Sequence, residues 1–336
     1  YRFLGVSTGR EVGAEREPPV SIRASHIQEL DMTGHLEGKN IAITGGGSGI
    51  GKAITLACAD EGANIVVADY GVAMDGSDPS SEVADAVVAE ITAKGGSAVA
   101  VAGDISQFDV GEQVVATAVD NWGSIDGVVC PAGVLRERML FNMSEDEWDH
   151  VVAVHLKGHF NVYRAAFARM RKQETGGSLV GFTSGAFTAS TAQANYSAAK
   201  GGIVSLTRSA ALTAASLRMR GGPAINANCI APVAKTRMSE NVPFEIETGE
   251  PEDIAPMAIY LLSDAGRDVN AQIYTVVGGR ISVWNQPMEV RTMMAGDDGW
   301  TPESIAERFG EVGQEPNPFI ADLERRMAEM AAEKSE

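Results

Sequence analysis

The chain has 336 residues, 44% hydrophobic and 21% charged, which is enough for one large or two small globular domains with a buried core. Its formal net charge of −18 argues against nucleic acid as a partner, because such a protein repels phosphates. The three cysteines (Cys58, Cys130 and Cys229) lie far apart in apolar runs, and neither they nor the five histidines show metal-ligand or disulfide spacing. We therefore expect core cysteines in a reduced cytoplasmic protein without a metal.

The apolar runs are only strand-length, so no membrane span is expected, and the first residues do not resemble a signal peptide. Residues 1–31 show no sustained hydrophobic period, whereas the segment from Met32 onward looks like the beginning of a fold. We expect an N-terminal extension (1–31), a Rossmann-type domain (32–280) and a C-terminal extension (281–336).

The first motif is a strand, a glycine loop and a helix in immediate succession. The β-branched run 40–44 precedes Gly45-Gly-Gly-Ser-Gly-Ile-Gly51, and a helical apolar pattern follows. Glycines let the backbone approach a pyrophosphate, and the helix N-terminus offers free N–H groups. The alternative is a plain glycine turn, since such clusters are common. The candidate cofactor-binding residues of this loop are Gly45, Ser48, Gly49, Ile50 and Gly51.

The second expected strand, 63–69, ends on Asp69, which lies 18 residues after Gly51. A carboxylate at this point can accept hydrogen bonds from the adenine ribose and would repel a 2′-phosphate. An ordinary strand-end aspartate in a turn is the alternative. With the glycine loop upstream we favour the ribose role, and hence NAD over NADP.

Strands and helices continue to alternate along the chain. Further helices are expected near 83–91 and 108–121, and further strands at 98–102, 128–130, 224–230 and 272–277. This alternation predicts an α/β fold, a doubly wound parallel sheet of Rossmann type with helices on both faces.

Tyr196 and Lys200 stand at positions i and i+4 of an expected helix, so their side chains share one face. A nearby ammonium favours the phenolate and would lower the pKa of Tyr196 from its reference of about 10. Tyr196 can then exchange a proton with a carbonyl or alcohol oxygen, which the hydroxyl of Ser184 would hold. A surface tyrosine–lysine pair is the alternative for this motif alone.

Taken together, these motifs resemble the short-chain dehydrogenase/reductase family from about residue 36 to about residue 279. The motifs occur in the family's order: Thr44-Gly45-x-x-x-Gly49-x-Gly51, Asp69, Asp104, Ala132-Gly133, Ser184, Tyr196-x-x-x-Lys200 and Pro232. Segments 133–140 and 154–160, with Trp148, look most like the dehydrogenase unit of peroxisomal multifunctional β-oxidation enzymes and its bacterial relatives.

The resemblance implies hydride transfer between NAD and a secondary alcohol or ketone, with Ser184, Tyr196 and Lys200 as catalytic residues. It favours a 3-hydroxyacyl thioester, with a CoA-linked form as one option, and a bulky or cyclic alcohol such as a steroid is the alternative. It also implies a homotetramer or homodimer built on the helices near 150–172 and 194–218. The residues it adds to the cofactor site are Asp104, Ile105, Ala132, Gly133, Pro232 and Thr236, together with Tyr196 and Lys200.

The chain departs from the family pattern at several positions. Pro131 replaces an asparagine after the fourth strand, His155 stands where the family has a catalytic asparagine, and Val233 replaces the glycine after Pro232. His155 is either a holder of a relay water or a structural histidine at a helix kink. An ungapped count would put Thr183 in the place of Ser184, but the sequence Thr-Ser-Gly-Ala favours Ser184. These departures leave a second alternative, in which the chain is a non-catalytic scaffold subunit that binds the cofactor.

Two further features bear on partners. Arg136, Arg138, Lys235 and Arg237 are candidates for binding CoA phosphates, with exposed solubilising charge as the alternative. The tail positions Ile320, Leu323, Met327 and Met330 have helical spacing among charged residues. We expect that amphipathic helix to pack on its own or a neighbouring subunit, because its polar face is not rich in basic residues.

Overall fold

The computed structural model describes residues 34–72, 79–188, 190–235, 248–297 and 299–316, and a few positions between 320 and 328. The chain divides into two units, 1–33 and 34–336, and the expected extension 1–31 lies outside the described residues. Within the described part, no helix is both long and apolar enough to cross a membrane. The same part contains no group of three or more histidine, cysteine or acidic side chains placed to hold a metal.

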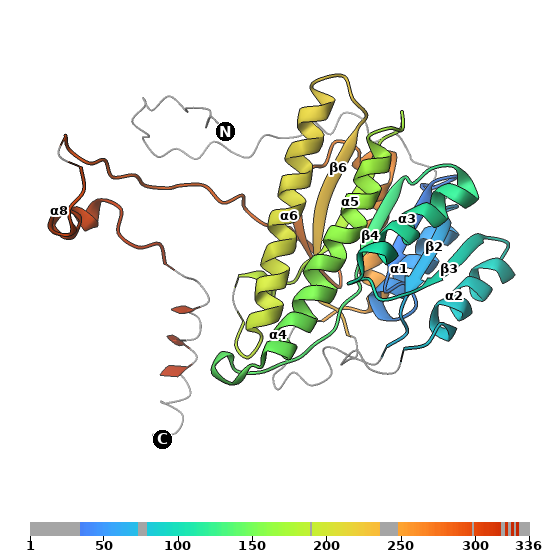
Figure 1. The fold of residues 1–336 in the computed structure, drawn as a ribbon, viewed down its shortest axis with the longest axis horizontal. Coiled ribbons are helices and arrows are strands. Elements are labelled where there is room, and N and C mark those ends of the chain that lie inside the picture. The colour runs from blue at the N-terminus through green and yellow to red at the C-terminus, as the bar shows by residue number, and fades with distance from the viewer. Residues whose placement is uncertain are drawn as a thin grey trace. The chain divides into compact units, whose positions relative to one another are not determined.

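One eight-stranded sheet forms the centre of the unit, in the order β3-β2-β1-β4-β5-β6-β7-β8 (Figure 1). The strands are β1 Asn40–Thr44, β2 Asn64–Asp69, β3 Ser97–Ala102, β4 Gly127–Cys130, β5 Gly177–Phe182, β6 Ile225–Pro232, β7 Ile273–Val277 and β8 Arg280–Val283. All neighbouring pairs are parallel except β7 with β8. The central strands are buried along almost their whole length, and β4 is an unbroken apolar run, as expected for strands covered on both faces.

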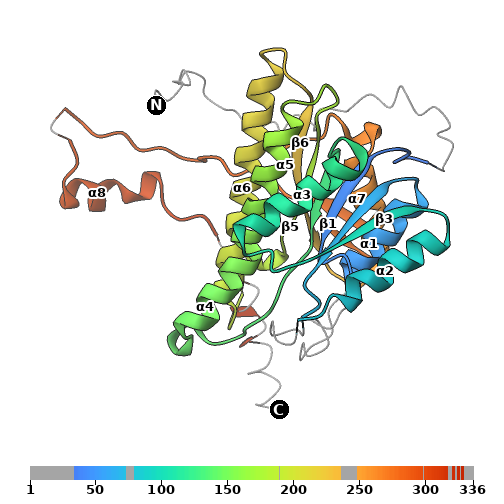
Figure 2. The same cartoon turned by 45° about the vertical axis from the view of Figure 1, so that its right-hand side comes forward.

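Helices cover both faces of the sheet (Figure 2), which confirms the predicted doubly wound α/β fold. One core cluster joins α1, α2 and α7 to the sheet, and a second joins α3, α5 and α6 to its other face. All three cysteines are buried, as predicted. The helices are α1 Gly49–Asp60, α2 Glu82–Ala93, α3 Phe108–Trp122, α4 Glu145–Val152, α5 Gly158–Met170, α6 Ala194–Arg218, α7 Ala255–Leu262 and α8 Pro302–Arg308.

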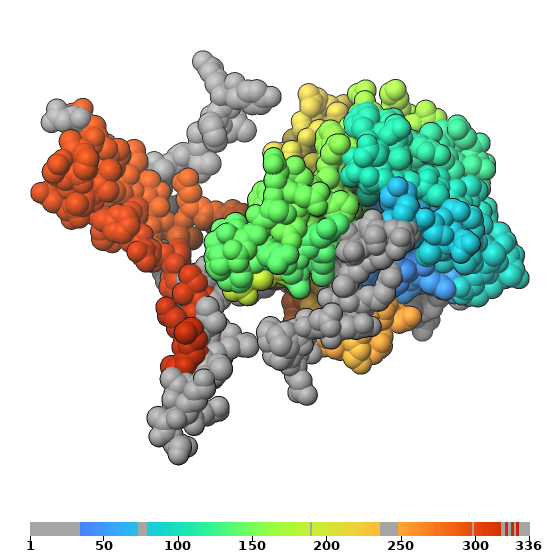
Figure 3. Space-filling view, turned by 60° about the horizontal axis from the view of Figure 1, so that its bottom comes forward, coloured from blue at the N-terminus to red at the C-terminus, as the bar shows by residue number. Residues whose placement is uncertain are grey.

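The strand order reverses between β1 and β4, and this determines where a ligand can bind. In open parallel sheets the chain leaves neighbouring strands in opposite directions at such a point, which opens a crevice at their carboxyl ends. Helix α4 lies at this edge, at the bottom of Figure 1. Figure 3 turns the edge toward the viewer, with α4 (green) on one side and the first strand–helix unit (blue) on the other.

The sheet extends beyond the last expected strand, 272–277. Arg280–Val283 folds back as β8, antiparallel to β7, because Gly278 adopts a positive φ of 48° and allows a tight turn. Trp284 follows, and its indole N–H donates to the Thr275 hydroxyl at 2.8 Å. Of the predicted tail helix, Leu323 and Met330 lie outside the described residues.

Candidate active site

The glycine loop connects β1 to α1 and lies against the chain that follows β4. Gly45 has a positive φ of 61°, and a side chain at Gly51 would collide with the carbonyl oxygen of Gly45. The loop therefore lies close against the start of α1, whose first N–H groups have no partner within the helix. All five predicted loop residues (Gly45, Ser48, Gly49, Ile50 and Gly51) line one pocket.

Asp69 ends β2 beside this loop. Its carboxylate accepts hydrogen bonds from the backbone N–H of Gly47 at 2.8 Å and from that of Gly71 at 2.7 Å. Each oxygen atom of the side chain is thereby fixed, and Asp69 lines the same pocket as the glycines. A carboxylate held at this point suits a ribose diol and opposes an added phosphate.

Asp104 and Ile105 line the pocket at the end of β3. Burial acts to raise the pKa of Asp104, but hydrogen bonds from Ser106 and Gln107 outweigh it and hold the pKa below its usual range. The carboxylate is thus engaged with the turn that starts α3, and the Ile105 side chain is only 8% exposed. Ala132 and Gly133, from the chain after β4, complete this part of the lining.

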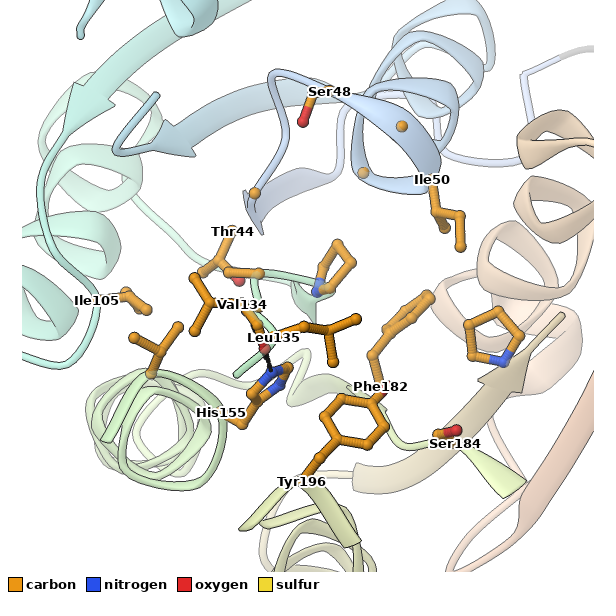
Figure 4. A pocket seen from close by; sticks show the side chains of 18 of the residues that line it. Thr44, Ser48, Ile50, Ile105, Val134, Leu135, His155, Phe182, Ser184 and Tyr196 are labelled. Atoms are coloured by element: carbon orange, nitrogen blue, oxygen red, sulfur yellow. Dashed lines mark hydrogen bonds between the residues drawn. The ribbon is translucent and has the colours of Figure 1, made fainter. Parts of the chain in front are cut away.

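A wider helical turn lies beside the pocket, after the loop that follows β4. Between α4 and α5, residues Ala153–Lys157 form a π-helical turn that buries His155. The His155 Nε2 atom lies 3.2 Å from the Val134 nitrogen and 2.8 Å from the Val134 oxygen. The dashed line in Figure 4 marks the contact of this ring with Val134. A side chain at Gly133 would overlap the imidazole, so this position of His155 requires a glycine at residue 133. Burial lowers the pKa of His155 well below its usual value, so the ring is neutral.

A second buried histidine, His159, was not singled out from the sequence. Its Nδ1 atom lies 2.6 Å from the carbonyl oxygen of His155, and its Nε2 atom accepts the Phe182 N–H at 3.1 Å. Burial is the main cause that lowers the pKa of His159 to about 3. A neutral ring with its proton on Nδ1 satisfies both contacts. Segment 154–160 contains this residue, but the sequence gives it no role, because both contacts depend on the fold.

Lys200 lies beside the same end of β5. Its ammonium donates to the Phe182 carbonyl oxygen at 2.7 Å and lies 5.3 Å from the centre of the Tyr196 ring. Phe182 therefore has its N–H bound by His159 and its carbonyl bound by Lys200. The strand β4 has already ended at Cys130, and Pro131 has no N–H to offer a neighbouring strand.

The structure separates the two candidate hydroxyls. Thr183 is 2% exposed, and its hydroxyl donates to the Lys200 backbone carbonyl at 3.0 Å. Ser184 lines the pocket, and its hydroxyl accepts the Ala186 N–H at 3.2 Å. The Tyr196 ring meets the edge of the His155 ring with centroids 5.1 Å apart. Ser184, Tyr196 and Lys200 thus come together, and the geometry favours Ser184 over Thr183.

The protonation of the pair differs from the expectation. Burial raises the pKa of Tyr196 to about 12, although the neighbouring Ser184 hydroxyl opposes the rise. Burial also lowers the pKa of Lys200 to about 7, with Cys229 and Cys130 acting in the opposite direction. The prediction that Lys200 holds the phenol's pKa below 10 is therefore wrong for the protein alone, because both groups lose their water.

The last part of the lining comes from the end of β6. Pro232 and Val233 border the pocket, and the Val233 N–H donates to the Val276 oxygen at 2.9 Å. Thr236 lies outside the described residues. The whole pocket has a volume of about 600 Å³ and runs from Asp69 to Tyr196.

The basic residues proposed for CoA phosphates have acidic partners. Arg138 pairs with Glu147 at 2.9 Å, Lys235 with Glu250 at 2.9 Å, and Arg136 lies 3.9 Å from Asp146. Arg237 lies outside the described residues. These pairs favour the structural or solubilising alternative over a preformed phosphate patch.

Residues 39–245 match the family described as short chain dehydrogenase. A crystal structure of a short chain dehydrogenase from Mycobacterium avium is 37% identical, superposes with a TM-score of 0.71, and matches 85% of this chain and 99% of its own. The hydroxyacyl-CoA dehydrogenase ChsB1 of Mycobacterium tuberculosis is 37% identical over 88% of this chain and 96% of its own length.

The fold, the pocket and these matches define the class: the chain belongs to the short-chain dehydrogenase family, whose members use a nicotinamide cofactor. Within that family it resembles the branch predicted from the sequence. The peroxisomal multifunctional enzyme type 2 of Mus musculus is 36% identical over 82% of this chain, which spans 37% of that longer enzyme.

Proposed function

We propose that this protein is an NAD-dependent dehydrogenase that interconverts a 3-hydroxyacyl thioester, CoA-linked, and the corresponding ketone. The glycine cradle and the carboxylate of Asp69 fit a dinucleotide, with Asp69 on the adenine ribose. Asp104, Ile105, Ala132, Gly133, Pro232 and Thr236 are proposed to complete the cofactor site.

A bound nicotinamide would supply the hydride acceptor in oxidation and the hydride donor in reduction. Ser184 orients the substrate oxygen by a hydrogen bond. Tyr196 takes the hydroxyl proton in oxidation and returns it in reduction. Lys200, when charged, stabilises the phenolate through space at 5.3 Å from its ring.

The observation that carries this proposal is the convergence of Ser184, Tyr196 and Lys200 at one end of a pocket whose other end holds Asp69 and the glycines. The thioester rests on the relative named as a hydroxyacyl-CoA dehydrogenase, which this chain matches over nearly its whole length.

The test is reduction of NAD⁺, followed at 340 nm, with (3R)- and (3S)-hydroxyacyl-CoA substrates of several chain lengths. Steroid and simple cyclic alcohols form the second arm. We expect turnover with one acyl-CoA stereoisomer. Turnover with steroids alone would overturn the substrate class, and binding of NAD without turnover of any alcohol would favour the scaffold subunit.

Cofactor choice gives a separate prediction. In Asp69→Ser, the carboxylate that opposes a 2′-phosphate is removed, so we expect kcat/KM for NADP⁺ to rise and that for NAD⁺ to fall. Each change should be roughly 10- to 100-fold, because a charged hydrogen bond contributes about 1.5–3 kcal/mol. Steady-state kinetics with both cofactors measures the ratio.

Asp60→Ser is the matched control for that experiment. Asp60 is an exposed aspartate at the end of α1 that pairs with Lys94 and does not line the pocket. It should leave the cofactor ratio unchanged. An unchanged ratio in Asp69→Ser would show that this carboxylate does not select the cofactor.

A further inference from the structure

Asn195 stands directly before Tyr196 in the first turn of α6. Its side chain is buried, with 1% of the residue exposed. A buried amide loses its water and must find partners inside the protein. The sequence places this residue next to Tyr196 but assigns it no role.

The Asn195 amide uses its hydrogen-bonding groups on three different segments. Its Nδ2 atom donates to the Arg136 carbonyl at 3.0 Å and to the Glu147 carbonyl at 2.8 Å. Its Oδ1 atom accepts the N–H of Tyr196 at 2.8 Å. Both amide protons and the oxygen are thereby engaged. One side chain thus joins the loop after β4, helix α4 and the first turn of α6.

The same three segments are also joined at the surface. The Arg138 guanidinium donates from Nε and Nη2 to one Glu147 oxygen at 3.0 and 2.9 Å, and its backbone N–H donates to the Ala192 carbonyl at 2.7 Å. Glu147 in turn completes the capping box that starts α4 with Ser144. Arg138 therefore braces the outside of the junction that Asn195 holds from the inside.

The loop held in this way borders the reaction site. Val134 and Leu135, just before Arg136, line the pocket, and Val134 also holds the His155 ring. A change at the junction therefore alters the position of Tyr196 relative to this wall. Displacement of about 1 Å at a reacting group can cost on the order of a hundredfold in rate.

We propose that Asn195 is a positioning residue, which fixes the Tyr196 end of α6 against the loop 134–138 and helix α4. The inference rests on the proposed function, since it assigns Tyr196 the reacting phenol. It also predicts a mechanical role for Arg138 in place of phosphate binding. The dinucleotide end of the pocket, from Gly45 to Asp69, takes no part in the junction.

The main test is Asn195→Asp, which keeps the size and an acceptor but replaces both donors facing the two carbonyl groups. We expect kcat to fall about 10- to 100-fold, while the Kd for NAD(H), measured by fluorescence titration, stays within about twofold. Asn121→Asp is the control, because Asn121 makes the same kind of amide-to-carbonyl bond on the exposed side of α3. It should change neither quantity.

Arg138→Met provides a second variant that does not disturb a buried site, since this arginine side chain is 54% exposed. We expect kcat to fall about two- to fivefold. The loss in the double variant with Asn195→Asp should be less than the product of the single losses, because both act on one junction. A multiplicative loss would overturn the proposed shared junction.

Hydrogen exchange measured by mass spectrometry tests the junction without any turnover. In Asn195→Asp, amides of 134–138 and 147–152 should exchange faster, while those of 45–52 keep their wild-type rates. Unchanged exchange at 134–138, or unchanged kcat, would overturn the proposal. Equal acceleration across the whole protein with a matching loss of NAD binding would also overturn it, as that would show a general structural role. Absence of turnover in the wild type would count against the proposed function alone.

Discussion

Tyr196→Phe is expected to lower kcat roughly 10²- to 10⁴-fold, the range that a positioned general acid or base contributes. The ring remains, so its edge contact with His155 and the shape of the pocket are preserved. The Kd for NAD(H) should therefore stay within about twofold of the wild-type value. Stopped-flow and steady-state measurements with the acyl-CoA substrate, followed at 340 nm, would give both quantities.

The pH dependence identifies the phenol more sharply than the rate does. Because the pKa of Tyr196 is raised to about 12, its ionised fraction increases with pH throughout the accessible range. Because the phenolate needs a charged Lys200 beside it, oxidation should speed up as the pH rises to about 7 in the wild type and level off once Lys200 loses its proton. Tyr196→Phe should lose this slope. Tyr163→Phe is the control, a buried tyrosine whose hydroxyl contacts Thr207 away from the pocket. A slope that persists in Tyr196→Phe would assign the base to another group.

Much of the fold was predictable because its signals are local. The run 40–44, the glycine loop and the strand ending on Asp69 each depend on neighbours within a few residues, and all three occur in the structure as expected. Tyr196 and Lys200 share a helix face by the geometry of the helix alone. Buried parallel strands also leave nearly continuous apolar runs, which are easily recognised.

The remainder depends on contacts between distant segments. The sequence assigns no role to His159 or Asn195, because their partners at Phe182, Arg136 and Glu147 are brought near only by folding. The π-helical turn at 153–157 likewise has no simple periodic signal. The predicted direction of the Tyr196 pKa shift was wrong, because the sequence shows the neighbouring charge of Lys200 but does not show that burial removes water from the phenol.

The departure at Pro131 has a physical explanation in the same contacts. At position 131, a residue with a backbone N–H could hydrogen-bond the end of β5. The N–H and carbonyl of Phe182, at that end, are already bound by His159 and Lys200. The proline therefore leaves no unpaired group at Phe182, and this departure alone gives little support to a non-catalytic scaffold. Lys200 serves the end of the strand as well as the reaction site, which ties stability to catalysis.

Lys200→Met tests that link and is expected to lower kcat by roughly a thousandfold while stabilising the fold. Burial lowers the pKa of Lys200 from 10.5 to about 7, which costs the folded protein roughly 4 kcal/mol at neutral pH. Removing the amine ends this cost but leaves the Phe182 carbonyl unpaired, a loss of about 1–3 kcal/mol. The net gain in the free energy of unfolding at pH 7 should be roughly 2 kcal/mol, measured by urea denaturation.

The sign of the pH dependence separates this explanation from simple repacking. Between pH 7 and 10.5 the unfolded chain binds a proton at Lys200 that the folded protein has released, so raising the pH stabilises the wild type. Lys200→Met lacks this titrating group, so its gain in the free energy of unfolding over the wild type should shrink as the pH rises from 7 to 9.5. Lys172→Met, at an exposed lysine after α5, should show no such trend relative to the wild type. If the variant's gain in the free energy of unfolding stays constant with pH, burying the charge of Lys200 does not destabilise the wild type. The variant would then be stabilised by packing alone.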